Sequence, residues 1–214
     1  REGSAVASLL GCVPITGAEA SARRLKQAAS PLIVHVASHG FFKPDQACSA
    51  GSSIDQSLSE DLFLSAEEVE QSMLRSGLVL AGANSSSLDS SDNGFLTALE
   101  ATHLNLQGTE MVVLSACDTG RGDIQTGEGL YGLQRALIVA GAKSTLLSLW
   151  KVPDEATYVF MQRFYSLLKE GFGRSDALVA VQGEFRQHEN EDWHHPYYWA
   201  AWQLVGDWRP INGL

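Results

Sequence analysis

His39 and Cys117 each come just after a short apolar run of the sequence. A histidine, with a pKa near 6.5, accepts the proton of a cysteine thiol, whose pKa in a free peptide is about 8.5. The thiolate attacks a carbonyl carbon, and the imidazolium then protonates the leaving amine. If the two residues meet in space, they predict hydrolysis of an amide bond. Taken singly, His39 fits a surface or capping role equally well, and Cys117 fits an inert buried thiol better.

The attacked carbonyl oxygen becomes negatively charged and needs fixed N–H donors nearby. Gly40 directly follows His39, and without a Cβ its backbone can approach a substrate closely. The backbone amides of Gly40 and Cys117 are therefore the predicted oxyanion-hole donors.

Three apolar runs predict the strands that would position this pair. They are residues 32–37 (LIVHVA), 111–116 (MVVLSA) and 144–150 (STLLSLW). Each is continuous rather than alternating, which is typical of parallel strands covered on both faces. Sites in such sheets form beyond the carboxyl ends of the strands. Neighbouring strands lie about 5 Å apart, so His39 and Cys117 would face each other if their strands are adjacent.

Helical patterns lie between and around these runs. The expected helices are residues 18–29, 129–140 with Gly141 as the stop, 154–169 and 175–187. Residues 198–205 (YWAAWQLV) resemble a final strand. This order predicts an α/β fold with three layers, in which helices flank a mostly parallel central sheet.

Two polar stretches interrupt the order, residues 43–60 and 83–94, and both are predicted to be exposed loops. Each is either a plain connection or a loop that borders a binding site.

The composition narrows the function classes. The chain has 214 residues, 44% of them hydrophobic, and a formal net charge of −10. The acidic balance disfavours nucleic acid and anionic membrane surfaces as principal partners. No apolar run approaches the roughly 20 residues that span a bilayer. The three cysteines, at unrelated spacings, indicate neither a disulfide framework nor a zinc cluster and suit a reducing, cytoplasmic setting.

Three segments together carry a more specific signal: VHVASHGFF, the long stretch from VVLSACDTG to SLWKVPDEAT, and HPYYWAAWQLVG near the end. They resemble the CHAT domain family, caspase-like cysteine protease domains often found downstream of tetratricopeptide repeats. The resemblance runs from about Gly17 to Gly206. It implies a caspase-hemoglobinase fold, a dyad of His39 and Cys117, and hydrolysis of protein or peptide substrates without a metal or organic cofactor. It also implies an upstream repeat domain or an activating partner.

The sequence departs from the family pattern at several positions. Ser115 stands where related metacaspases have an aspartate that binds a basic side chain, and Asp118 stands where many members have glutamate. Trp150 and Lys151 resemble a Trp-Arg pair that lines substrate pockets in caspases, although Trp150 also suits core packing and Lys151 suits a solvated position. Ser115 weakens the case for a basic substrate residue, and Lys151 hints at an acidic one. We expect a single caspase-like domain over residues 1–214 that lacks the family's N-terminal strands.

Other polar residues have simpler interpretations. His35 lies inside the first run and is expected to be a hydrogen-bonded core histidine. Asp154 fits a helix start better than a site. The segment HENEDWHH, with His188, His194 and His195, is predicted to be a polar loop rather than a metal site. The rival to an endopeptidase is a catalytically silent, protease-like signalling or interaction module; amide or acyl chemistry on a small molecule is excluded only by the resemblance.

Overall fold

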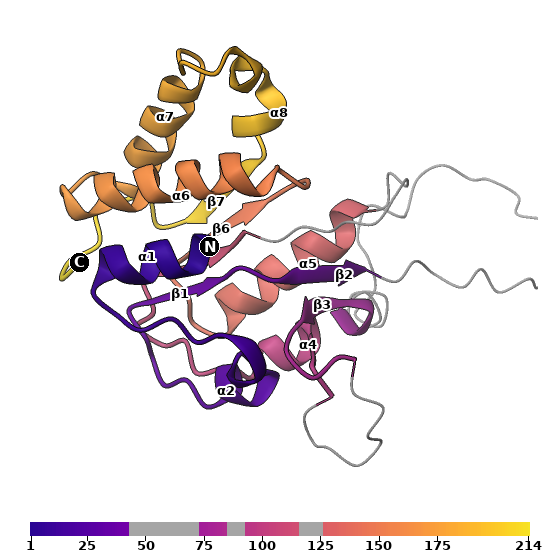
Figure 1. The fold of residues 1–214 in the computed structure, drawn as a ribbon. Helices are drawn as coiled ribbons and strands as arrows, with labels where there is room; N and C mark the ends of the chain where they lie inside the picture. The colour runs from indigo at the N-terminus through magenta and orange to yellow at the C-terminus, as the bar shows by residue number, and fades with distance from the viewer. Residues whose placement is uncertain (43–72, 85–92, 116–125) are drawn as a thin grey trace, which may run out of the picture.

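A four-stranded sheet forms the centre of the molecule (Figure 1). The structure is a computed structural model that describes residues 1–42, 73–84, 93–115 and 126–214. In spatial order the strands are β1 (Ile33–Val36), β5 (Met111–Leu114), β6 (Ser144–Ser148) and β7 (Trp202–Gly206). The first three are parallel and β7 is antiparallel to β6. The predicted mostly parallel sheet is confirmed, and β1 and β5 are direct neighbours.

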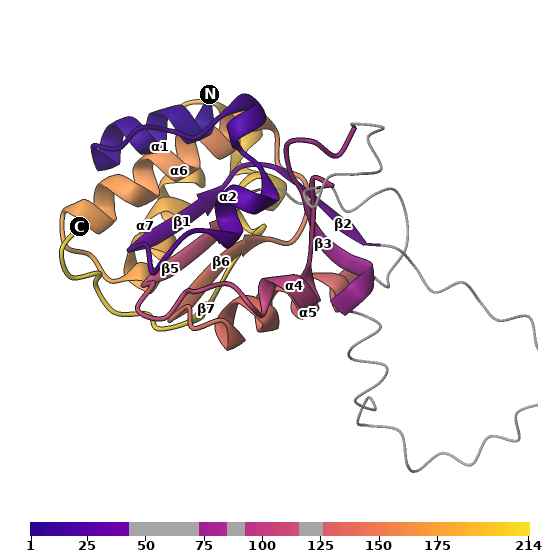
Figure 2. The same cartoon turned by 90° about the horizontal axis from the view of Figure 1, so that it is seen from below.

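Helices cover both faces of this sheet, as Figures 1 and 2 show. One face packs against α1 (Glu2–Leu10), α6 (Asp154–Lys169) and α7 (Arg174–Phe185). The other packs against α2 (Ala22–Lys26), α4 (Ala98–Ala101) and α5 (Thr126–Val139). Strands β5 and β6 are buried on both faces, which explains their continuous apolar sequence. The predicted three-layer α/β fold is confirmed.

The long helix α6 illustrates how the sequence determines the packing. It has the bounds that its apolar period predicts, and its buried side chains include Phe160, Phe164 and Leu168. Pro153 precedes its first turn, and Asp154 and Glu155 are acidic residues within that turn, where the helix dipole favours negative charge. Helix α5 ends at Val139, and Gly141 follows with a φ of 110° that favours glycine.

A second, smaller sheet was not expected from the sequence. It contains β2 (His39–Phe42), β3 (Ser76–Val79) and β4 (Phe95–Thr97), all antiparallel. Only Ala37 and Ser38 separate β1 from β2. His39 follows the first strand, as the sequence predicts, but its pairing with Val79 makes it the first residue of β2.

Two further boundaries differ from expectation. The final strand begins at Trp202 rather than Tyr198, because Pro196–Trp199 form helix α8, with Pro196 in its first turn and the His195 side chain accepting from the Tyr197 amide. The predicted helix at 18–29 is divided into a 3-10 helix, η1 (Gly17–Glu19), and α2, which Ser21 caps. Helix α1 was not foreseen at all.

The two predicted loops are described only in part. Residues 43–60 lie outside the described residues, as do residues 85–92 of the second stretch. At the ends of that stretch, Asn84 and Asn93 are exposed and Gly94 is buried.

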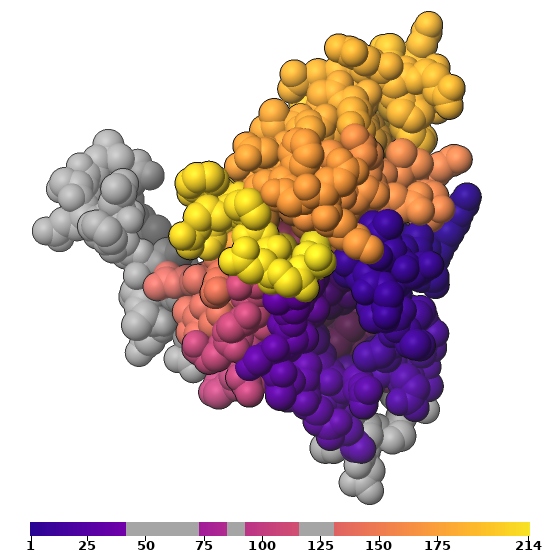
Figure 3. Space-filling view, turned by 90° about the vertical axis from the view of Figure 1, so that its left-hand side faces the viewer, coloured from indigo at the N-terminus to yellow at the C-terminus, as the bar shows by residue number. Residues whose placement is uncertain are grey.

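A charged cluster lies where β5, β7 and α7 meet, at the end of the sheet where β5 begins. Arg174 is fully buried and pairs with the carboxylates of Glu110 and Asp207. Lys143 donates to the other Glu110 oxygen at 2.6 Å. The C-terminal residues, yellow in Figure 3, lie on this side of the molecule, and the Trp208 and Arg209 carbonyls accept from the first amides of α7.

Candidate active site

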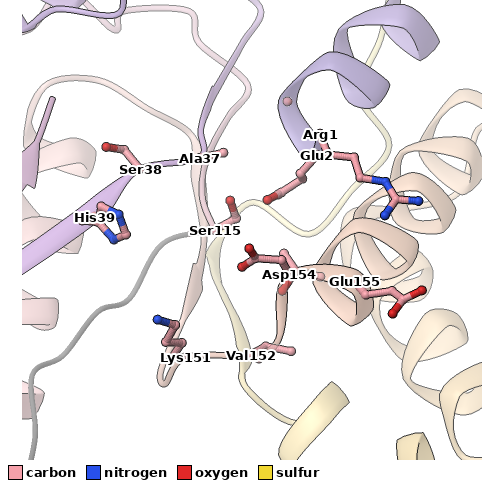
Figure 4. A pocket seen from close by; sticks show the side chains of 12 residues that line it. Arg1, Glu2, Ala37, Ser38, His39, Ser115, Lys151, Val152, Asp154 and Glu155 are labelled. Carbon is pink, nitrogen blue, oxygen red and sulfur yellow. The ribbon is translucent and has the colours of Figure 1, made fainter. Parts of the chain in front are cut away.

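A pocket of about 520 Å³ opens at the carboxyl ends of β1 and β5 and beside the segment that follows β6 (Figure 4). This is the edge at which sites form in open α/β sheets, and the volume is within the usual range for ligand pockets. Its walls come from the first residues of α1 and α6, the β1–β2 connection and the residues after β5 and β6.

His39 lines this pocket. The residue before it, Ser38, donates its hydroxyl to the carbonyl of Val79, which ties the β1–β2 connection to β3. His39 and Gly40 pair with Val79 and Leu78 in the small sheet. Strand pairing therefore fixes the backbone of His39 and of the predicted oxyanion donor Gly40.

Ser115 lies on the same pocket, directly after β5. Its amide donates to the Val36 carbonyl at 3.1 Å, which extends the β1–β5 pairing by one residue. Its Oγ atom is buried and has no hydrogen-bond partner in the part of the chain that the structure describes. The predicted nucleophile Cys117 and its neighbour Asp118 lie outside the described residues.

Trp150 and Lys151 follow β6 at the pocket's edge. The Trp150 indole N–H donates to the Tyr197 carbonyl at 2.8 Å, and the Tyr197 hydroxyl donates to the Lys151 carbonyl at 2.7 Å. Trp150 also packs against the core cluster under α6, whereas Lys151 is exposed and lines the pocket. The structure thus brings Lys151 to the site with His39 and Ser115, while Trp150 supports the segment from behind.

Three carboxylate residues that line the pocket, Glu2, Asp154 and Glu155, were not anticipated as site residues. Asp154 is in the first turn of α6, as the sequence predicts, but it also lines the pocket. Glu2, the first residue of α1, lines it as well. The acidic first turn of α6 was a signal for Asp154. No sequence signal pointed to Glu2, since helix α1 itself was missed.

His35 is the hydrogen-bonded core histidine that the sequence predicts. Its Nδ1 lies 3.0 Å from the Tyr165 hydroxyl and its Nε2 lies 3.1 Å from Glu2 Oε1. Burial, together with the Glu2 charge, raises the pKa of Tyr165 well above its ordinary value, so the hydroxyl is protonated. The contacts then suit the tautomer in which Nε2–H donates to Glu2 and Nδ1 accepts from Tyr165. His35 therefore holds Glu2 at the pocket.

The histidines near the C-terminus have structural contacts. The His188 ring packs against Trp193, the His194 Nε2 contacts the His188 carbonyl at 2.8 Å, and His195 caps α8. Among the described residues no group of three or more histidine, cysteine, aspartate or glutamate side chains could hold a metal ion. Likewise, no helix in the described ranges is both long enough and apolar enough to cross a membrane.

Comparison with known proteins identifies the family of this chain. A family model described as CHAT domain matches residues 1–207, so the match includes α1 and begins before the Gly17 at which the motif resemblance begins. Tetratricopeptide repeat protein 28 from Homo sapiens is 30% identical over 215 residues, which cover 99% of this chain and 8% of that protein. The protein of the same name from Mus musculus is 29% identical over 218 residues, covering 99% and 9%. The chain spans less than a tenth of the length of these relatives.

Proposed function

Because the chain belongs to the CHAT domain family, we propose that it is a cysteine endopeptidase that hydrolyses peptide bonds in protein substrates, with Cys117 as nucleophile and His39 as general base and acid. The observation that supports this best is that His39 and Ser115 line one pocket, and Cys117 follows Ser115 by two residues. Two residues of chain reach at most about 7 Å, and this short reach supports the proposal that the Cys117 thiol acts at this pocket.

The reaction follows from the two side chains. The His39 imidazole takes the proton of the Cys117 thiol, and the thiolate forms a bond to the carbonyl carbon of the scissile peptide. The imidazolium gives its proton to the leaving amine as the C–N bond breaks, which leaves a thioester. His39 then takes a proton from water, whose oxygen attacks the thioester and releases the acid product and the thiol.

The oxyanion of each tetrahedral intermediate needs donors that are fixed in advance. The amides of Gly40 and Cys117 are the proposed donors, and each is worth about 3–4 kcal/mol of transition-state stabilisation. Pairing of β2 with β3 supports Gly40 in this role because it holds the backbone after His39 in place. Ser115, Asp118, Trp150 and Lys151 are the proposed substrate-binding residues, Trp150 acting through the segment that it supports.

We propose that the endopeptidase is gated by other parts of the full-length protein or by a partner. The related proteins are named for tetratricopeptide repeats, which supports a repeat domain as the neighbour of this chain. A thiol nucleophile also suits a reducing compartment, and we propose the cytoplasm.

Turnover by the full-length protein tests the proposal. A peptide library, with and without candidate activating partners, is incubated with the wild type, Cys117→Ala and His39→Ala, and the products are identified by mass spectrometry. We expect Cys117→Ala to abolish cleavage and His39→Ala to lower kcat by roughly 10²- to 10⁴-fold. Thermal unfolding shows whether each variant keeps its fold.

The matched control is Cys12→Ala, which removes an exposed free thiol and should keep full activity. If no peptide is cut by the wild type under any condition, or if Cys117→Ala cleaves as well as the wild type, the proposal is wrong. The chain would then be a signalling or interaction module.

A further inference from the structure

We propose that the pocket beside His39 binds a lysine or arginine side chain of the substrate, next to the bond that is cleaved, through the carboxylates of Glu2 and Asp154. The inference rests on the proposed function in taking the bound chain to be a substrate. The pocket, its charges and its buried hydroxyl are independent of that function.

The two carboxylates come from separate helices and converge on one space. Glu2 begins α1 and Asp154 begins α6, and these helices pack side by side. In Figure 4 both carboxylates are directed toward Ser115. A helix N-terminus favours an acidic residue for its own sake, but that preference does not explain why two such ends meet at the mouth of one pocket.

Neither carboxylate is neutralised by a cation of the pocket wall. Within the described ranges Asp154 has no ion pair, and the only partner of Glu2 is His35, at 3.1 Å. Lys151 is exposed and forms no ion pair with either carboxylate. The guanidinium of Arg1 lies 4.8 Å from the centre of the Tyr158 ring, and Figure 4 shows it directed away from Ser115.

Ser115 supplies the second sign of a ligand. Its buried Oγ has no partner among the described residues, although buried polar atoms in proteins are nearly always paired. A hydroxyl oxygen and two carboxylates are all acceptors, while an ammonium or guanidinium group offers only donors. A basic side chain would satisfy the three groups together.

In the sequence, Ser115 and Lys151 favour an acidic substrate residue over a basic one. The inference from the structure is the opposite preference. Ser115 lacks the carboxylate that the related metacaspases have at this point, but the negative charge is supplied from α1 and α6. His35 and Tyr165 hold Glu2 from beneath, so its position does not depend on the ligand. An acidic substrate residue would be repelled by both carboxylates.

The test compares three peptides that differ at one residue, which is arginine, its neutral isostere citrulline, or aspartate. The full-length protein is used as wild type, Asp154→Asn and Glu2→Gln. Asp192→Asn is the matched control because Asp192 is exposed and lies outside the pocket. We expect kcat/KM of the wild type to favour arginine over citrulline by roughly ten- to a hundredfold, as hydrogen bonds to charged groups would give. Either pocket variant should lose most of this preference, and the control should retain it.

A second measurement does not require turnover. Fluorescence anisotropy of labelled peptides on Cys117→Ala, with and without Asp154→Asn, reports binding alone. Equal cleavage of the arginine and citrulline peptides, or a preference for aspartate, would overturn this inference and leave the endopeptidase intact. If the arginine peptide binds in a manner that depends on Asp154, but the wild type does not cleave it, the endopeptidase proposal is overturned and the cation site is supported. Equal affinity for the arginine, citrulline and aspartate peptides would overturn the inference, whether or not the peptides are cleaved.

Discussion

The amide of Ser115 lies 3.1 Å from the carbonyl oxygen of Val36 and donates a hydrogen bond to it, one residue beyond the end of β5. This bond keeps the ends of β1 and β5 together at the point where the chain continues to His39 on one side and to Cys117 on the other. A dyad built from segments remote in the sequence needs such a constraint, because a displacement of 1 Å can cost about a hundredfold in rate.

Selective alkylation should identify an activated thiol. A free cysteine is only about 3% thiolate at pH 7, so a cysteine paired with histidine should react roughly tenfold faster. We expect iodoacetamide to modify Cys117 before Cys12 and Cys48, as measured by peptide mass spectrometry over time. His39→Ala should remove the difference. Equal labelling of all three cysteines in the wild type would contradict an activated Cys117.

Tyr197→Phe should weaken substrate binding without unfolding the protein. The variant loses the 2.7 Å bond from the Tyr197 hydroxyl to the Lys151 carbonyl and keeps the bond that Trp150 donates to the backbone of residue 197. We expect KM to rise several-fold, kcat to change little, and the free energy of unfolding to fall by no more than about 1.5 kcal/mol.

Tyr198→Phe is the control for that experiment. Its hydroxyl has no hydrogen bond within the described ranges, while its ring contact with Tyr197 survives the change. The same rise of KM in both variants would show that the contact to Lys151 is not the cause.

Arg174→Met should destabilise the protein far more than Arg163→Met. The Arg174 side chain is 0% exposed, and its removal leaves the Glu110 and Asp207 carboxylates without their buried partner. Loss of one member of a buried pair costs about 3–5 kcal/mol. Arg163, by contrast, is 41% exposed and pairs with Glu184 at the surface, which is worth under about 1 kcal/mol. Urea unfolding measures both values, and equal losses would contradict the role of Arg174.

Acid should weaken the charged cluster that Arg174 forms with Glu110 and Asp207. Burial acts to raise the pKa of the Glu110 carboxyl, but hydrogen bonds from Lys143 and Arg174 outweigh it and hold the pKa below its ordinary value of 4.5. The unfolded chain therefore binds more protons than the folded one below about pH 4.5, and stability is lost as the pH falls from there through the folded pKa. Glu110→Gln should reduce the slope of unfolding free energy against pH in this range. An unchanged slope would show that Glu110 carries no part of it.

The sequence was sufficient for the elements with strong local signals. The continuous apolar runs became β1, β5 and β6, and the period of α6 predicted both of its ends. The small sheet was missed because β2 pairs with β3, and β3 with β4, across long separations in the chain. The four residues HGFF also carry no period of their own. Helix α8 was missed because its aromatic residues look like strand formers, whereas Pro196 and the His195 cap favour a turn of helix.

The candidate site was predicted only where it depends on elements with strong local signals. The edge of the sheet followed from the parallel strands, and His39 and Cys117 were expected to lie close together there. His39 lines the pocket at this edge together with Ser115, while Cys117 lies outside the described residues. The roles of Cys117, Asp118 and the oxyanion donors stay predictions. Glu2 could not be predicted because it reaches the pocket through the packing of α1 on α6. These helices are far apart in the sequence, and no local pattern encodes their contact.

Glu110 and Ser115 stand at opposite ends of β5, five residues apart, or about 16 Å in an extended strand. Glu110 pairs with Lys143 and Arg174, and neither of these residues lines the pocket. Protonation of Glu110 therefore weakens contacts at the foot of the sheet and none of the contacts described at the pocket. Acid tolerance and substrate preference of this fold can consequently be tuned independently, by substitutions at either end of a single strand.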